Sequence, residues 1–258
     1  MPDFTDENLT ASRFDRVVLT GAHFNKVVLT NARFDAVDLT GTKFRAVDLV
    51  DVEVTGDIEN LRINGVDVAP LVDAELDRRY PGRAKMRPLD ADGFREAWAV
   101  LEQLWENTVE RARSMPLASL HIRVDGEWSF IETLRHLVFA TDAWVRRAIL
   151  GVPSPWDPLD LPHDEMDDDP NIPRAHDARP TLDDVLAVRA HRVDAVRHVL
   201  ANLTDESLGG ITTVVLEPGY PASESFPIAR CLRIVLNEEW QHRLYAERDL
   251  DALSTPTP

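Results

Sequence analysis

Large apolar residues recur every five positions along the first fifty residues of the chain. A small or β-branched residue stands two positions before most of them. Neither the 3.6-residue period of a helix nor the two-residue period of a strand gives this stripe. A fixed short repeat predicts a coil whose turns stack on one another. The large apolar positions are Phe4, Leu9, Phe14, Leu19, Phe24, Leu29, Phe34, Leu39, Phe44, Leu49 and Val54.

This repeat resembles the pentapeptide-repeat family. The resemblance implies a short right-handed quadrilateral β-helix with four pentapeptides per coil, whose central Leu or Phe and small residue point inward. We expect this β-helix over residues 1–68, with the repeat fading after Val54 and a turn at Asn64-Gly65. Residues 69–90 are expected to form a capping helix, opened by Pro70, and a linker.

From residue 91 to residue 251 the apolar positions take helical spacing. Four amphipathic helices are predicted, and helices of this length favour an all-α four-helix bundle. Thr181 and Asp184 have the spacing of a capping box at the start of the third helix. Residues 252–258 are expected to be a disordered tail. The predicted helices run near 91–113, 128–150, 181–203 and 227–251.

The connection between the second and third helices, residues 151–180, is long and acidic. It carries eight acidic and two basic residues, together with several prolines. A connection of this length inside a compact domain is usually a lid, a binding loop or a disordered segment.

Charge and composition limit the kinds of partner that the protein is expected to bind. The formal net charge is −17 and the isoelectric point is about 4.8, so a phosphate backbone would be repelled and nucleic-acid binding is disfavoured. No apolar run reaches the ~20 residues that cross a bilayer, and the N-terminus lacks the basic and apolar regions of a signal peptide. A single cysteine, Cys231, cannot form an internal disulfide, which is typical of a cytoplasmic protein.

The densest chemistry lies on the fourth predicted helix. Glu238 and His242 are four residues apart and therefore share one helix face. Carboxylate oxygen and imidazole nitrogen suit a divalent metal, and a third ligand must come from another helix. His136 on the second helix is the leading candidate, and Glu239 is the rival of Glu238. The alternative is a solvated pair of side chains and a histidine satisfied within the core.

Two segments resemble the DinB/YfiT-like superfamily: Trp128–Leu137 and Asn237–Leu250. The resemblance covers roughly residues 90–251 and implies a four-helix bundle that holds a divalent metal with three side chains, most often histidines. Its mycothiol-dependent maleylpyruvate isomerase branch uses one histidine and a Glu-x-x-x-His motif instead. Carried over, these ligands are His136, Glu238 and His242, with Zn²⁺ the leading metal and Ni²⁺, Mn²⁺ or Fe²⁺ open.

The superfamily also implies a reaction class. Characterised members often transfer or isomerise through mycothiol, bacillithiol or glutathione, because a thiol bound to a metal loses its proton and becomes a nucleophile. Cys231 is not needed for this and is expected to be a buried apolar residue. Four further side chains could line the substrate site, although for the two aromatic residues on the fourth helix the hydrophobic core is the favoured alternative. They are Trp156, His163, Trp240 and Tyr245.

Two functions stay open at this stage. The first is a metal-dependent thiol S-transferase, or a related metalloenzyme, acting on a small molecule. The second is a non-catalytic interaction protein whose repeat binds a protein partner, with a structural metal or none. A homodimer fits either function. We expect Arg135, Arg243 and Arg248, which neighbour the metal-ligand candidates in sequence, to face solvent.

Overall fold

The structure is a computed structural model that describes residues 4–35, 37–56, 58–164 and 166–254. It divides into two compact units, residues 1–56 and 57–258, each of which is described by itself. Residues 255–258 of the predicted tail lie outside the described residues. Residues 252–254 of that tail are helical, because the last helix extends through Ser254.

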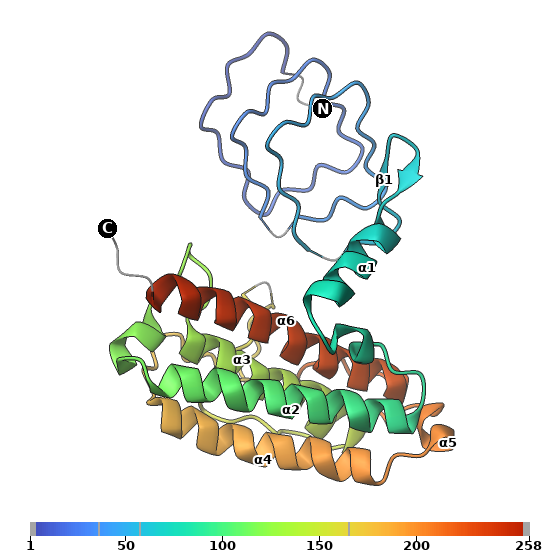
Figure 1. Cartoon of the computed structure of the whole chain (residues 1–258), viewed down its shortest axis with the longest axis vertical. Coiled ribbons are helices and arrows are strands. Elements are labelled where there is room, and N and C mark those ends of the chain that lie inside the picture. The colour runs from blue at the N-terminus through green and yellow to red at the C-terminus, as the bar shows by residue number, and fades with distance from the viewer. Residues whose placement is uncertain (1–3, 36, 57, 165, 255–258) are drawn as a thin grey trace. The chain divides into compact units, whose positions relative to one another are not determined.

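The first unit winds through hydrogen-bonded turns every ten residues with bends midway between them, so the chain changes direction every five residues. Figure 1 shows this winding. Amide groups at the turns donate to carbonyl oxygens three residues earlier, as from Ser12 to Leu9 at 3.0 Å and from Ala22 to Leu19 at 2.9 Å. The third turn residue has a positive φ, 76° at Gly21 and 60° at Asn31, as a type II turn requires. Glycine and asparagine therefore recur there because they tolerate that conformation.

The expected β-helix is not shown in this unit. No strand is present among its described residues, and its large apolar side chains are exposed, Phe14 by 60% and Leu29 by 51%. The inward stacking of these side chains, on which the β-helix prediction rested, is therefore absent from the part of the unit that the structure describes. The periodic turns are what the repeat establishes.

The second unit begins with a hairpin and a short helix. Strands β1 (Arg62–Ile63) and β2 (Val66–Asp67) are antiparallel, and Asn64 and Gly65 form the predicted turn with φ values of 50° and 84°. Helix α1 (Ala69–Arg79) follows, with Pro70 in its first turn. Contacts group α1 with the helical unit.

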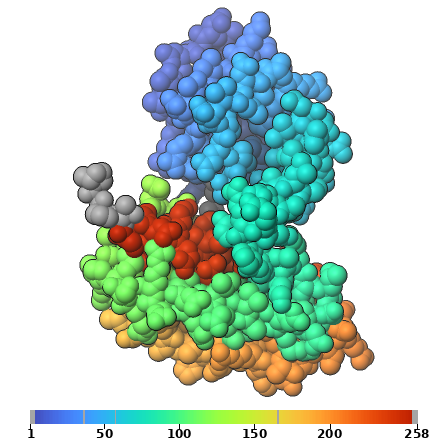
Figure 2. Space-filling view, in the orientation of Figure 1, coloured from blue at the N-terminus to red at the C-terminus, as the bar shows by residue number. Residues whose placement is uncertain are grey.

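Four long helices make the body of this unit, as predicted. They are α2 (Ala91–Arg113), α3 (Phe130–Thr141), α4 (Leu182–Ala201) and α6 (Ile228–Ser254). Each helix packs on two others in the ring α2–α6–α3–α4, and Figures 1 and 2 show α2 between α6 and α4 on one face. Short helices at Arg83–Met86, Leu117–His121 and Asp205–Leu208 (α5) fill the connections.

Side-chain caps fix where α3 and α4 begin. Ser129 accepts from the Glu132 amide while the Glu132 carboxylate accepts from the Ser129 amide, and Thr181 and Asp184 form the same capping box. The helix predicted to end near residue 150 changes character before it ends, because α3 runs directly into a π-helix at Asp142–Ile149. Such wide turns are frequently found at functional sites.

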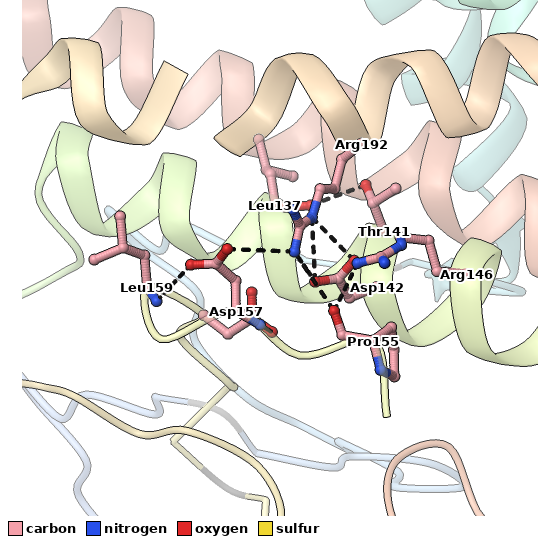
Figure 3. A network of polar contacts seen from close by, with 9 residues as sticks. Leu137, Thr141, Asp142, Arg146, Pro155, Asp157, Leu159 and Arg192 are labelled. Carbon is pink, nitrogen blue, oxygen red and sulfur yellow. Dashed lines mark hydrogen bonds and ion pairs between the residues drawn. The ribbon is translucent and has the colours of Figure 1, made fainter. Parts of the chain in front are cut away.

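The loop of residues 151–180 packs on the bundle. Arg192 of α4 donates to the buried Asp142 carboxylate at 2.7 Å and lies 3.6 Å from Asp157 of the loop (Figure 3). Arg146 donates to Asp142 and to the Pro155 carbonyl oxygen at 2.9 and 2.6 Å. These bonds join the start of the loop to both α4 and the π-helix. Among the loop's apolar side chains, Leu161 is fully buried.

No helix in the described residues is both long enough and apolar enough to cross a membrane.

Candidate metal centre

His136, Glu238 and His242 meet between α3 and α6. One ligand atom from each lies within 4.8 Å of the others, the spacing that a single ion requires. His136 stands two turns into α3, after the capping box, and Glu238 and His242 occupy successive turns of one α6 face. Exposure of the side chains is 7% for His136, 17% for His242 and 28% for Glu238.

The orientation of the His136 ring is set by the loop. Its Nδ1–H donates to the Leu161 carbonyl oxygen at 3.0 Å, and its Nε2 lies 3.3 Å from Glu238 Oε2. A neutral imidazole with its proton on Nδ1 carries a lone pair on Nε2. Two lone pairs then face each other across 3.3 Å, so the contact needs either a second ring proton, which makes His136 a donor to Glu238, or a metal ion in its place. The donor set and its geometry therefore fit a divalent metal.

The protonation states of the other two side chains fit the same role. His242 Nδ1 lies 2.9 Å from the Glu238 carbonyl oxygen and 3.2 Å from Glu238 Oε2. Burial, followed by repulsion from His136, lowers the pKa of His242 to about 4, so the ring is neutral at pH 7. Burial opposes ionisation of Glu238, but when the His136 ring carries a second proton, its hydrogen bond and charge, together with the charges of His242 and His163, hold the pKa of Glu238 below the usual value.

Glu239, the rival ligand, is committed elsewhere. Its carboxylate accepts from Arg189 of α4 at 2.9 and 3.2 Å, with both side chains buried. The Arg189 guanidinium also lies over the Trp105 ring, 5.1 Å from its centroid. This ion pair joins α4 to α6 and leaves Glu238 as the carboxylate that faces His136.

Aromatic rings surround the three side chains. Trp128 lies 4.5 Å from the His136 ring and 6.1 Å from the His242 ring, measured between centroids. Tyr245 lies 6.0 Å from His242, and Phe139 lies 6.1 Å from His136. These rings limit the access of water to the ligand atoms.

The other predicted lining residues fall into two groups. Trp156 stacks on Phe139 at 5.7 Å, so Phe139 alone separates it from the His136 ring, and His163 packs at 5.6 Å against Tyr220, which in turn stacks on Phe139. Trp240 is 2% exposed and belongs to the hydrophobic core, which agrees with the core alternative for that residue. Cys231 is fully buried, as expected.

The expectation that three neighbouring arginines face solvent was wrong for Arg135. Its side chain is fully buried and donates to the carbonyl oxygens of Leu159 and Ala175. The expectation was also wrong for Arg243, whose side chain is only 12% exposed, whereas Arg248 is exposed and pairs with Glu127 on the surface. Sequence reasoning also missed Trp128 and Tyr220. Trp128 could have been found, because it stands eight residues before His136 in the segment that resembles the superfamily.

Comparisons with known families agree with this architecture. The family model for the DinB superfamily matches residues 100–246, which is 147 of the 258 residues and includes all three clustered side chains. The model for pentapeptide repeats matches residues 12–49 with eight copies. No curated protein and no solved structure matches the chain.

Proposed function

The chain belongs to the DinB superfamily, with pentapeptide repeats at its N-terminus, and from that premise we propose that it is a divalent-metal-dependent thiol S-transferase acting on a small molecule. His136, Glu238 and His242 are the proposed ligands. Zn²⁺ is the leading metal because it accepts nitrogen and carboxylate donors in a three-residue set, although Ni²⁺, Mn²⁺ and Fe²⁺ share these preferences.

The observation that carries the proposal is the contact between His136 Nε2 and Glu238 Oε2 at 3.3 Å, with His136 Nδ1–H already donated to Leu161. Among the described residues, no fourth His, Cys, Asp or Glu joins the group. A catalytic site keeps one position open, whereas a structural zinc site is closed by four protein ligands. A three-residue set therefore favours catalysis.

Each residue of the centre has a task that follows from its surroundings. A bound metal would supply Lewis acidity that lowers the pKa of a coordinated thiol or water. Glu238 contributes the negative charge, and His242 enters as a neutral donor without first losing a proton. Trp128 and Tyr245 cover the histidine rings, which strengthens electrostatic interactions by excluding water.

The thiol is proposed to be mycothiol or another low-molecular-weight thiol, by resemblance to the branch with a Glu-x-x-x-His motif. His163 and Trp156 remain proposed substrate contacts through their positions beside Tyr220 and Phe139. A cytoplasmic location and a homodimer belong to the same proposal, as does the β-helical winding of the repeat.

The second candidate is a non-catalytic interaction protein. Its support is the exposure of the repeat's apolar side chains, such as Val18 at 85% and Val28 at 83%, because exposed apolar surface commonly marks a protein interface. Under this alternative any metal is structural, and the repeat binds a protein partner.

Metal analysis of the purified full chain, never exposed to chelator or nickel resin, tests the proposal. We expect about one equivalent of metal in the wild type, and its loss in His136→Ala and His242→Ala with circular dichroism unchanged. His191→Ala is the matched control, because that histidine is exposed on α4. Absence of metal from the wild type, even after Zn²⁺, Mn²⁺ or Ni²⁺ is offered, would overturn the proposal.

A second experiment separates catalysis from a structural metal. The Co²⁺-loaded chain is titrated with mycothiol, bacillithiol or glutathione, and the sulfur-to-cobalt charge-transfer band is recorded. A band that appears with one of these thiols supports the transferase. Full metal occupancy with no thiol-dependent band favours the interaction protein.

A further inference from the structure

Two consecutive side chains of α3 bind the same loop. Arg135 donates from Nε to the Leu159 carbonyl oxygen at 2.8 Å, and His136 donates from Nδ1 to the Leu161 carbonyl oxygen at 3.0 Å. The two acceptors are separated by one residue, Asp160. The hydrogen bond that holds the Leu159 carbonyl therefore also restricts the position of the Leu161 carbonyl.

Arg135 also reaches the far limb of the loop. Its Nη2 donates to the Ala175 carbonyl oxygen at 2.7 Å. One guanidinium thus binds two separate parts of the loop of residues 151–180 to α3, one at Leu159 and one at Ala175. A planar group with donors on several edges is suited to such a junction, because its hydrogen-bond directions are fixed relative to one another.

The burial of Arg135 argues against a purely packing role. The side chain is 0% exposed, and its Nη1 has no hydrogen-bond partner among the described residues. Placing a charged group in such an environment is costly, and an apolar side chain of similar length would pack at lower cost. What arginine adds at this position is the pair of directed bonds to the loop.

We propose that Arg135 is a positioning residue for the metal centre: it holds the loop so that the Leu161 carbonyl fixes the tautomer of His136, which couples metal affinity to loop docking. This inference rests on the proposed function. It adds that the docked conformation of the loop is needed for full metal affinity. Because coupling between two equilibria is reciprocal, metal binding must stabilise the docked loop as much as the docked loop strengthens metal binding.

The test compares wild type with Arg135→Met, Arg135→Lys and Arg95→Met. Arg95 is the matched control, because it also donates to two carbonyl oxygens, that of Leu200 at 2.8 Å and that of Leu203 at 3.0 Å. These two acceptors lie at the end of α4 and just after it, away from the loop of residues 151–180. Three properties are measured: the affinity for Zn²⁺ by competition with a chelating dye, the protonation of the His136 ring nitrogens by ¹⁵N NMR without metal, and hydrogen exchange of the Leu159 and Asp160 amides.

We expect Arg135→Met to lower Zn²⁺ affinity by about 10–100-fold, the usual effect of losing support behind a ligand. The metal-free variant should lose the NMR signature of a ring protonated on Nδ1, and both loop amides should exchange faster. Arg135→Lys should recover part of the affinity because it can still donate to one carbonyl, and Arg95→Met should match the wild type. Unchanged Zn²⁺ affinity and tautomer in Arg135→Met would overturn the proposal.

The wild type alone provides a further test that does not depend on the variants folding. Zn²⁺ should slow exchange of the Leu159 and Asp160 amides, and unchanged exchange would show that the coupling is absent. Failure of the proposed function gives a different result. In that case the wild type binds no Zn²⁺ at all, while the NMR comparison without metal still decides whether Arg135 sets the His136 tautomer.

Discussion

The His136 ring is oriented by the main chain of Leu161, whose carbonyl oxygen accepts from His136 Nδ1–H at 3.0 Å. A carbonyl oxygen can only accept, so this bond places the ring proton on Nδ1 and the lone pair on Nε2. The acceptor belongs to an acidic loop far from α3 in sequence. The candidate metal centre is therefore assembled from two helices and a loop, and the loop's contribution depends on backbone geometry.

Exchanging each of the two neighbouring glutamates for glutamine should separate their roles. Glu238→Gln removes the charged oxygen donor, so Zn²⁺ affinity should fall by about 100-fold or more with the fold retained. Glu239→Gln leaves Arg189 buried beside a neutral partner, so the free energy of unfolding should fall by about 3 kcal/mol while Zn²⁺ stoichiometry is kept. Chelator competition and urea unfolding measure the two effects. Loss of Zn²⁺ in Glu239→Gln alone would reverse the assignment.

The bundle was predictable because its signals are local. Apolar spacing gave the 91–113 helix with the observed bounds of α2, and Thr181 with Asp184 marked the start of α4. Helix phase also placed Glu238 and His242 on one face. Helix phase could not decide whether Glu238 or Glu239 is the metal ligand. Glu239 is excluded as a ligand only by its ion pair with Arg189, which comes from another helix.

The parts that escaped prediction depend on contacts between distant segments. Arg135 was expected to face solvent, as most charged side chains do, and its acceptors are carbonyl oxygens that no side-chain pattern reveals. The change from α-helix to π-helix at Asp142 likewise accompanies a buried pair with Arg192 from α4. The repeat gave its period correctly, but its side chains are exposed where stacking was expected.

Cys231 should be inert in the folded protein. The side chain is fully buried, and burial raises the pKa of its thiol to about 11, so the reactive thiolate is scarce at pH 8. A chromogenic disulfide reagent should label less than a tenth of the native chain in the time that labels one equivalent in urea. Cys231→Ala should keep metal binding. Rapid labelling of the native chain would show that the thiol is accessible.

Removal of the repeat should leave the metal centre intact. His136, Glu238 and His242 and the helices that carry them all lie within residues 57–258, a compact unit by its contacts. A chain that begins at residue 58 should therefore keep the helical circular dichroism and the Zn²⁺ affinity of the full chain. Calorimetric titration measures the affinity. A clear loss of affinity would mean that the repeat supports the bundle directly.

Asp160 should make stability depend on pH in a defined window. Its carboxyl is fully buried beside Asp142, and burial, with that neighbouring charge second, raises its pKa to about 8. The Asp157 amide and the charge of Arg192 oppose this shift without cancelling it. The carboxyl is thus protonated in the native protein at pH 7, whereas in the unfolded chain it ionises near pH 4.

Between pH 4 and pH 8 the native state therefore binds more protons than the unfolded state at this site, so the group's contribution to the unfolding free energy falls as pH rises through that window and is constant outside it. Asp160→Asn mimics the protonated carboxyl and removes the dependence. The variant should match the wild type near pH 4 and exceed it by about 5 kcal/mol at pH 8, measured by urea unfolding of metal-free protein at each pH. Asp157→Asn, at a side chain that remains partly exposed, is the control and should show no such rise with pH. A difference between Asp160→Asn and wild type that stays constant from pH 4 to pH 8 would mean that Asp160 is ionised in the native loop.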